Sequence, residues 1–189
     1  VGGLLCAGVA WLLYHKHLSF KRIYLFAFLG YATHALLDAC TSYGTRLWLP
    51  FSNERVAWDN LSIIDPLYTL PLLGLMLWAA LARKTRILPI ALAFMLSYPL
   101  LGLWQNHRAS TFALSQLAAQ NITPERLRAS PSIGNNVLWR IQYQHQGRIY
   151  AAGVYQPWWG APKWYAGESL LVWQPQHTPL AANSPQAQD

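Results

Sequence analysis

The chain has 189 residues, of which 53% are hydrophobic and only 11% carry a charged side chain, and its formal net charge is +7. The basic residues form no continuous stripe, which excludes nucleic acid as a partner, and two cysteines are too few for a disulfide framework or a zinc ribbon. Residues 1–105 hold long apolar runs, whereas the rest of the chain is mixed and polar. We therefore expect a transmembrane helical domain over 1–105, a small extramembrane α+β domain over 106–180 and a disordered tail over 181–189.

Four apolar segments are candidates for membrane helices, and they cover residues 1–14, 23–38, 66–81 and 87–104. Crossing the hydrocarbon core takes about 20 residues, so the second and third segments are short by that measure. The first begins at Val1 without a preceding basic region, so we expect this N-terminus to lie inside a membrane helix whose upstream residues are absent from the sequence. The predicted fold class is mainly α: a multi-pass transmembrane helical bundle followed by a small α+β domain.

Two basic loops, 15–22 and 83–86, fall on the same side if the four helices alternate in direction. The positive-inside rule places both loops in the cytoplasm. The segment 39–65 then faces outward, as does everything after Trp104. For a bacterial inner-membrane protein that outer side is the periplasm, so we predict a periplasmic C-terminal domain.

The outward segment 39–65 is rich in Tyr and Trp, which favour the boundary between membrane and water, so we expect it to contact membrane lipids. Its last residue, Asp65, precedes Pro66. Proline at the first helical position with an acidic residue before it predicts a capped helix start. Asp59 could likewise cap a short helix or bond a turn. Both carboxylates are also candidates for a catalytic role.

His34 and Asp38 stand four residues apart in an apolar run that predicts a helix, so both side chains project from one face. Imidazole and carboxylate at this spacing can hold one metal ion together or can form a hydrogen-bonded pair. Ionisable residues at membrane depth are costly and usually functional. The structural alternative is a pair that clamps two membrane helices together.

After Trp104 we expect a helix over 107–120 and a second, short helix that starts at 123–125. Ser130-Pro131 should end it. Alternating side chains then predict two antiparallel strands, 137–144 and 149–155, joined by a turn at Gln146-Gly147, with 169–173 pairing beside them.

The run THALLDACTSYGTRLWLPFS from residue 33, followed by IIDPLYTLP from residue 63, resembles the YdjM family of bacterial inner-membrane proteins, which are described as metal-dependent hydrolases. The resemblance extends weakly to LWRIQY at 138–143. It implies that His34 and Asp38 belong to a metal site, and Asp65 matches the Asp that precedes proline in the family. This sequence lacks the acidic residues and the H-R-G-x-T-H-S-like motif that family members carry upstream.

Two functions follow from these features. The first is a membrane-bound metal-dependent hydrolase that cleaves an ester or phosphoester of an unknown, lipid-linked substrate, with His34 and Asp38 as ligands of a divalent ion, zinc or manganese. Asp65 or Asp59 would complete the site or take a proton from water, and Arg46 and Arg55 would hold an anionic group. Interfacial anchoring is the alternative role for these arginines. The second function is a non-enzymatic membrane anchor that senses the envelope or binds a partner.

Overall fold

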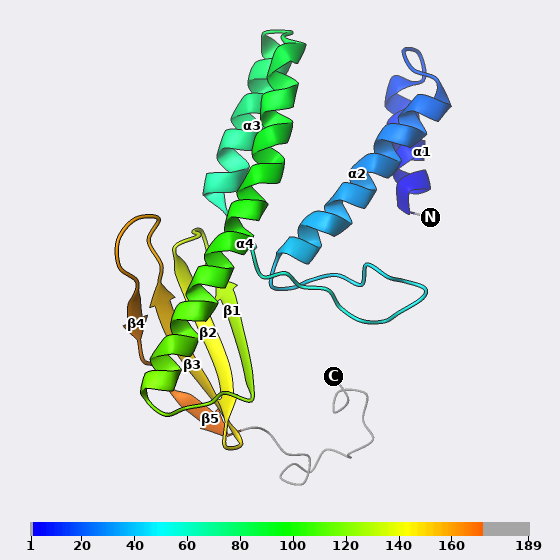
Figure 1. The fold of residues 1–189 in the computed structure, drawn as a ribbon. Coiled ribbons are helices and arrows are strands. Elements are labelled where there is room, and N and C mark those ends of the chain that lie inside the picture. The colour runs from blue at the N-terminus through cyan, green and yellow to red at the C-terminus, as the bar shows by residue number, and fades with distance from the viewer. Residues whose placement is uncertain (1, 172–189) are drawn as a thin grey trace. The chain divides into compact units, whose positions relative to one another are not determined.

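The computed structural model describes residues 2–171 and divides the chain into two compact units (Figure 1). The first unit comprises Val1–Trp104 together with Ile133–Asn136, and the second comprises Gln105–Ser132 with Val137–Asp189. One helix, α4, runs through the division. The first unit is helical and the second is built on an antiparallel sheet.

The helices are α1 (Gly2–Tyr14), α2 (Phe20–Cys40), α3 (Pro66–Leu81) and α4 (Leu88–Ala119), and a 3₁₀ turn, η1 (Thr85–Ile87), leads into α4. Two stretches are long and apolar enough to cross a membrane by length and composition: Phe20–Cys40, with a mean hydropathy of 1.4, and Thr85–Ala119, with 1.9. The expectation of four such helices is thus met by two, since α1 and α3 have 13 and 16 residues. Large apolar side chains are exposed along all four helices, as they are on helices that contact lipid.

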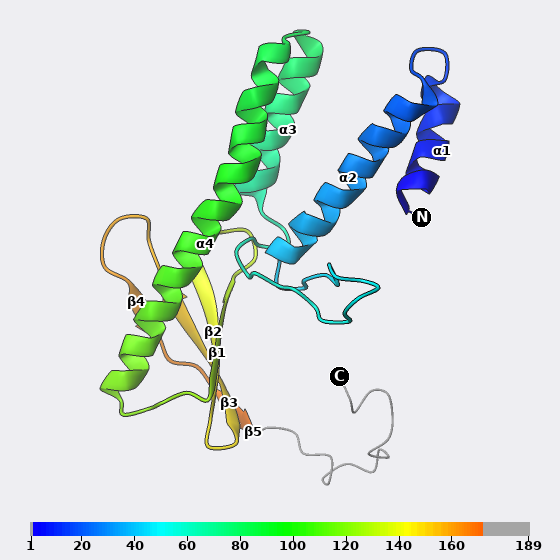
Figure 2. The same cartoon turned by 45° about the vertical axis from the view of Figure 1, so that its right-hand side comes forward.

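Aromatic packing joins α3 to α4, which lie side by side in both views (Figures 1 and 2). The ring of Tyr68 lies 5.4 Å from that of Tyr98 and 6.1 Å from that of Phe94. Pro99 lacks the N–H that would bond the carbonyl of Met95, four residues earlier in α4. The Tyr68 hydroxyl donates to this carbonyl at 3.4 Å, so a side chain of α3 supplies a donor to the carbonyl oxygen that Pro99 cannot bond.

The second unit holds β1 (Arg126–Pro131), β2 (Leu138–His145), β3 (Arg148–Tyr155), β4 (Lys163–Tyr165) and β5 (Ser169–Leu171). All pairings are antiparallel, in the order β1-β2-β3-β4, and β5 pairs with β3 as well. The strands predicted over 137–144 and 149–155 are confirmed, and the hairpin turns at Gln146 and Gly147, both with positive φ. Pairing beside them is confirmed over Ser169–Leu171, while residues 172 and 173 and the expected tail lie outside the described residues.

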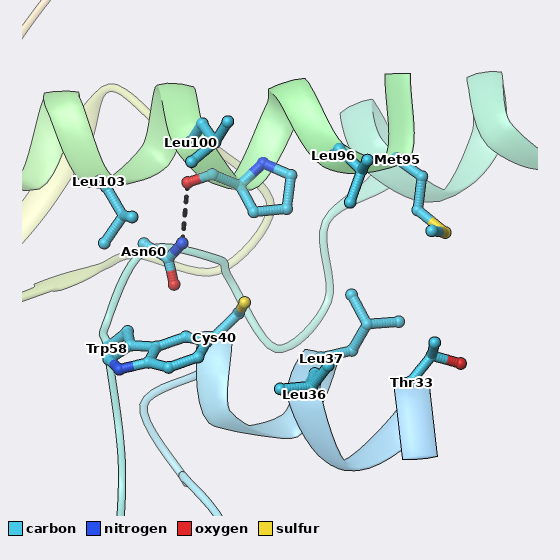
Figure 3. Close-up of a pocket in the computed structure, with 11 residues that line it drawn as sticks. Thr33, Leu36, Leu37, Cys40, Trp58, Asn60, Met95, Leu96, Leu100 and Leu103 are labelled. Carbon is cyan, nitrogen blue, oxygen red and sulfur yellow. Dashed lines mark hydrogen bonds between the residues drawn. The ribbon is translucent and has the colours of Figure 1, made fainter. Parts of the chain in front are cut away.

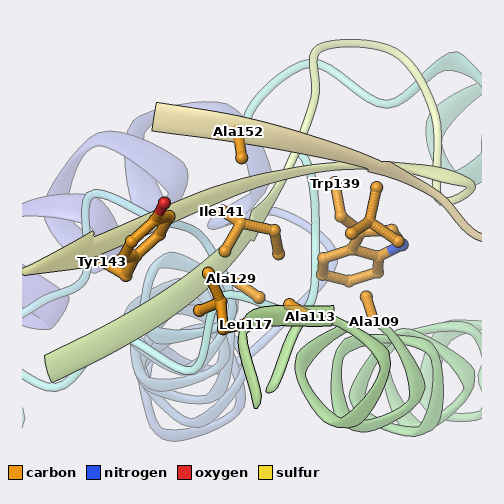
Figure 4. Close-up of a cluster of buried hydrophobic side chains, with 9 residues drawn as sticks. Ala109, Ala113, Leu117, Ala129, Trp139, Ile141, Tyr143 and Ala152 are labelled. Atoms are coloured by element: carbon orange, nitrogen blue, oxygen red, sulfur yellow. The ribbon is translucent and has the colours of Figure 1, made fainter. Parts of the chain in front are cut away.

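One face of this sheet packs on the C-terminal half of α4 (Figure 4). The core consists of alternate strand residues and of small or aliphatic helix residues: Ala109, Ala113, Leu117, Ala129, Trp139, Ile141, Tyr143, Ala152 and Val154. The helix residues recur every four positions, so they form one stripe along α4. Alanine at two of those positions leaves room for the fully buried ring of Trp139.

Three predictions for this region are wrong. The short helix expected from 123–125 is absent among the described residues, because β1 begins at Arg126. Its side chains alternate between the two faces of the sheet, with Leu127 and Ala129 pointing inward. Pro131 does not break a helix but ends β1, an edge strand, where a missing N–H disrupts no ladder. The break expected near Trp104 is also absent, since α4 is continuous.

Candidate functional site

His34 and Asp38 face each other on α2. Nε2 of His34 lies 3.5 Å from Oδ2 of Asp38, and the two side chains are 73% and 48% exposed. The sequence-based prediction that they share one helix face is therefore confirmed. Both partners belong to α2, so this ion pair by itself does not connect two helices. Its exposed donor atoms are accessible to a ligand.

Asp65 performs the capping role predicted for it. Its Oδ1 accepts hydrogen bonds from the backbone N–H groups of Leu67 at 3.1 Å and Tyr68 at 3.3 Å, at the start of α3. Its Oδ2 accepts from the hydroxyl of Tyr98 at 2.9 Å, and the residue is only 4% exposed. Both oxygens thus have donors from the protein, and the carboxylate links the start of α3 to α4.

Asp59 lies in the connection between α2 and α3, is buried, and has a positive φ of 51°. Its neighbours dock on the end of α2: Trp58 N–H donates to the Ala39 carbonyl at 2.7 Å, and Asn60 N–H donates to the Cys40 carbonyl at 3.0 Å. No helix follows Asp59 until Pro66 within the described structure. Asp59 therefore starts no helix, and it lies in an irregular segment whose backbone is hydrogen-bonded to the end of α2.

Arg46 and Arg55 lie on two segments that a β-bridge joins, and the sequence gives no signal of this bridge. Thr45 and Val56 form an antiparallel bridge with two backbone hydrogen bonds of 2.9 Å. Arg46 follows and Arg55 precedes this bridged pair by one residue, so the bridge brings the two segments that carry them side by side. Both side chains are exposed, and Nη1 of Arg55 donates to the Tyr43 carbonyl at 3.0 Å.

A pocket of about 420 Å³ lies between α2 and α4 (Figure 3). Its lining is almost entirely apolar and comprises Thr33, Leu36, Leu37, Cys40, Trp58, Asn60, Met95, Leu96, Pro99, Leu100 and Leu103. The volume falls in the range of small-molecule sites. His34 and Asp38 are not part of the lining, because they project from the neighbouring face of α2, about 100° around the helix from Thr33 and Leu37.

Asn60 is the central polar residue of this pocket, and sequence reasoning missed it. Its Nδ2 donates to the Pro99 carbonyl at 2.8 Å, and the residue is 1% exposed. Its backbone carbonyl contacts Gly102 of α4 so closely that no Cβ would fit there. A glycine two residues before the end of an apolar run was the only sequence signal of this approach.

The candidate residues do not form one cluster. His34 pairs with Asp38, Arg46 and Arg55 flank the bridge between Thr45 and Val56, and Asp65 bonds Tyr98. Across residues 2–171, no three His, Cys, Asp or Glu side chains are grouped closely enough to hold a metal ion. The donor atoms of His34 and Asp38 suit zinc or manganese, but a catalytic zinc site takes three protein ligands. The described residues thus supply part of a coordination shell and do not complete one.

The described residues combine two helices that are long and apolar enough to cross a membrane with a small antiparallel sheet. The family model described as YdjM inner membrane protein matches residues 2–109, more than half of the chain. The chain therefore belongs to the YdjM family of inner membrane proteins. No curated protein and no solved structure shows significant similarity to it.

Proposed function

We propose that this protein is a membrane-bound hydrolase in which His34 and Asp38 contribute two ligands to a divalent metal ion, zinc or manganese. The observation that carries the proposal is their 3.5 Å approach on one exposed face of an apolar helix. An exposed ion pair contributes little to stability, and charged groups on membrane helices are usually kept for function. A contribution to stability is therefore a weak explanation for the presence of His34 and Asp38 on this helix.

A bound divalent ion would supply a water molecule of lowered pKa, able to attack an ester or phosphoester at neutral pH. The contribution of the chain is to hold the ion with one imidazole nitrogen and one carboxylate oxygen. Further ligands must complete the shell, since the described residues offer no third donor beside the pair. Asp65 or Asp59 is the carboxylate assigned to the proton transfer, and both oxygens of Asp65 also accept hydrogen bonds from the protein.

The apolar pocket between α2 and α4 supports a lipid-linked substrate. Its walls come mainly from the two helices that are long enough for a membrane span, and their apolar side chains favour an apolar occupant. An acyl or isoprenoid chain has that character. Arg46 and Arg55 would hold the anionic head group of such a substrate by charge-assisted hydrogen bonds. The periplasmic location of the outward segment and of the C-terminal domain is part of the same proposal.

The test measures bound metal in the full-length protein purified from membranes. His34→Ala and Asp38→Asn are compared with His17→Ala and Glu54→Gln, which change a histidine and a carboxylate at other exposed positions of the first unit. We expect both variants of the pair to lose stoichiometric zinc or manganese, together with hydrolysis of a chromogenic phosphodiester, while the control variants keep both. Asp38→Asn protein that retains metal and activity would refute the metal role of this residue.

One observation favours the second function, a non-enzymatic anchor that senses the envelope or binds a partner. Asp65, a candidate catalytic carboxylate, is used entirely to cap α3 and to bond Tyr98. In this case His34 and Asp38 would bind no metal and would form only an exposed pair within α2. Absence of metal from every preparation of the full-length protein, with unchanged folding of His34→Ala, would support this function over the hydrolase.

A further inference from the structure

The turn that joins α3 to α4 holds an arginine at a position that favours glycine. After the cap residue Ala82, the backbone N–H of Arg83 donates to the Ala80 carbonyl at 3.3 Å. The N–H of Lys84 donates to the Ala79 carbonyl at 3.1 Å. These two bonds form a Schellman motif, in which the residue after the cap adopts a positive φ. Arg83 has a φ of 52°, which is strained for any residue with a Cβ, so backbone conformation does not explain the arginine.

Beside this turn, a hollow of about 310 Å³ lies between α3 and the start of α4. It is lined by Met76, Ala79, Ala80, Arg83, Thr85 and Leu88. The small side chains of the two alanines leave this space open, and the lining is apolar except for Arg83 and Thr85. Met76 precedes Arg83 by about two helical turns, which is roughly 10 Å along α3. The hollow therefore has an apolar stretch that ends at a cationic side chain.

The positive charge of this turn is not compensated by its neighbours along the chain. Arg83, Lys84 and Arg86 are all exposed. The sequence has no Asp or Glu between Asp65 and Glu125, so α3 and α4 carry no acidic residue. Within residues 2–171, the side chains of the three basic residues form no hydrogen bond and no ion pair. The guanidinium group of Arg83 is therefore available to an anion at the end of the hollow.

We propose that this hollow binds an anionic phospholipid, with the phosphate on Arg83 and part of one acyl chain against the apolar walls. A guanidinium group binds phosphate oxygens through paired, charge-assisted hydrogen bonds, and basic residues next to membrane helices attract anionic lipids. The volume lies at the lower end of ligand sites, so it suits a segment of one chain. The site shares no residue with the proposed metal ligands, so its test is independent of hydrolysis.

The experiment measures binding of fluorescently labelled phosphatidylglycerol to the full chain in micelles of an uncharged detergent. Salt at about 0.15 M screens charges that lie more than about 8 Å from the lipid phosphate. Unlabelled phosphatidylglycerol, phosphatidylcholine and inorganic phosphate are the competitors. We expect phosphatidylglycerol to displace the probe at a concentration about tenfold lower than phosphatidylcholine does. Inorganic phosphate should not displace it, because it has no chain to contact the apolar walls.

Two matched pairs of variants locate the site. Arg83→Gln and Arg86→Gln remove the same charge, but only the first of them changes the lining of the hollow. Ala80→Leu and Ala82→Leu enlarge two exposed side chains near the end of α3, and only the first of them fills the hollow. We expect Arg83→Gln to bind the probe about tenfold more weakly and Ala80→Leu to bind it more weakly as well. Both control variants should bind it like the parent protein.

A third variant, Arg83→Gly, separates lipid binding from stability. Glycine removes the charge and also the strain of the positive φ, so this variant should bind the probe weakly and unfold at the temperature of the parent protein or above it. A lower unfolding temperature would give Arg83 a structural role and overturn the proposal. Equal displacement by the two phospholipids, displacement by inorganic phosphate, or an equal loss in Arg83→Gln and Arg86→Gln would overturn it as well.

Discussion

The hydroxyl of Tyr98 donates a 2.9 Å hydrogen bond to Oδ2 of Asp65, a carboxylate that also caps α3 through its other oxygen. One buried group thereby orients the start of α3 against the middle of α4. Burying an ionised carboxylate is tolerable only when its oxygens are satisfied, and here three donors of the protein satisfy them.

This arrangement predicts coupled effects on stability. Tyr98→Phe removes one donor and should cost about 1 kcal/mol, and Asp65→Ala removes the cap and should cost about 0.5–2 kcal/mol or more. Because the two groups touch, the double variant should be less destabilised than the sum, by at least about 0.5 kcal/mol. Denaturant titration in detergent measures all three values. Strict additivity would show that the bond contributes nothing.

Gly102 should tolerate no side chain. A Cβ at this position would overlap the backbone carbonyl of Asn60, so Gly102→Ala must displace the segment that holds Asn60 against α4. We expect a loss of about 1–3 kcal/mol and a lower thermal midpoint. Gly74→Ala in α3 is the matched control, because its Cβ would meet no atom within 4 Å. That control should be neutral or stabilising by up to about 1 kcal/mol. Equal behaviour of the two variants would contradict the close approach.

Alkaline pH should destabilise the sheet unit through Tyr143. Burial raises the pKa of its hydroxyl above the ordinary value of 10.0, and the neighbouring Tyr150, whose ring stacks on it at 4.9 Å, raises it further. The unfolded chain then releases this proton at lower pH than the folded one. The contribution of Tyr143 to stability is therefore complete below about pH 10 and is lost as the pH rises through the folded pKa.

The measurement compares thermal midpoints between about pH 8 and pH 11. Tyr143→Phe should lose less stability over this interval than the parent protein, because it has no proton to release there. Tyr165→Phe, which changes an exposed tyrosine of β4, is the control and should behave like the parent. An alkaline loss that is identical in all three proteins would rule out this contribution.

The two basic loops predict the topology. A phosphatase reporter fused after Gln174 should be active, because that enzyme folds only in the periplasm, whereas the same reporter inserted after Lys84 should be inactive. The contrast follows from the lysines and arginines of 15–22 and 83–86, which resist translocation. Activity in the reverse pattern would place the sheet unit in the cytoplasm.

Local sequence was sufficient for much of the architecture. Apolar runs predicted the helices, a four-residue spacing predicted the approach of His34 to Asp38, and Asp65 before Pro66 predicted the capped start of α3. Alternation predicted β2 and β3. Each of these features depends on residues within one or two turns of helix or within one hairpin, so their periodicity is visible without knowledge of the fold.

Contacts between distant segments were decided only by the tertiary structure. Residues 126–131 form a strand because they pair with the edge of β2, with their inward positions matched to those of β2. The segment itself is short and has one proline before it and one within it, so its own sequence does not indicate a strand. The segments that carry Arg46 and Arg55 are joined by a single bridge, and the bond from Tyr98 to Asp65 joins residues 33 positions apart. Sequence determined which segments are helical or extended, since that follows from neighbouring residues. Which side chains meet depends on how those segments pack, and only folding brings them together.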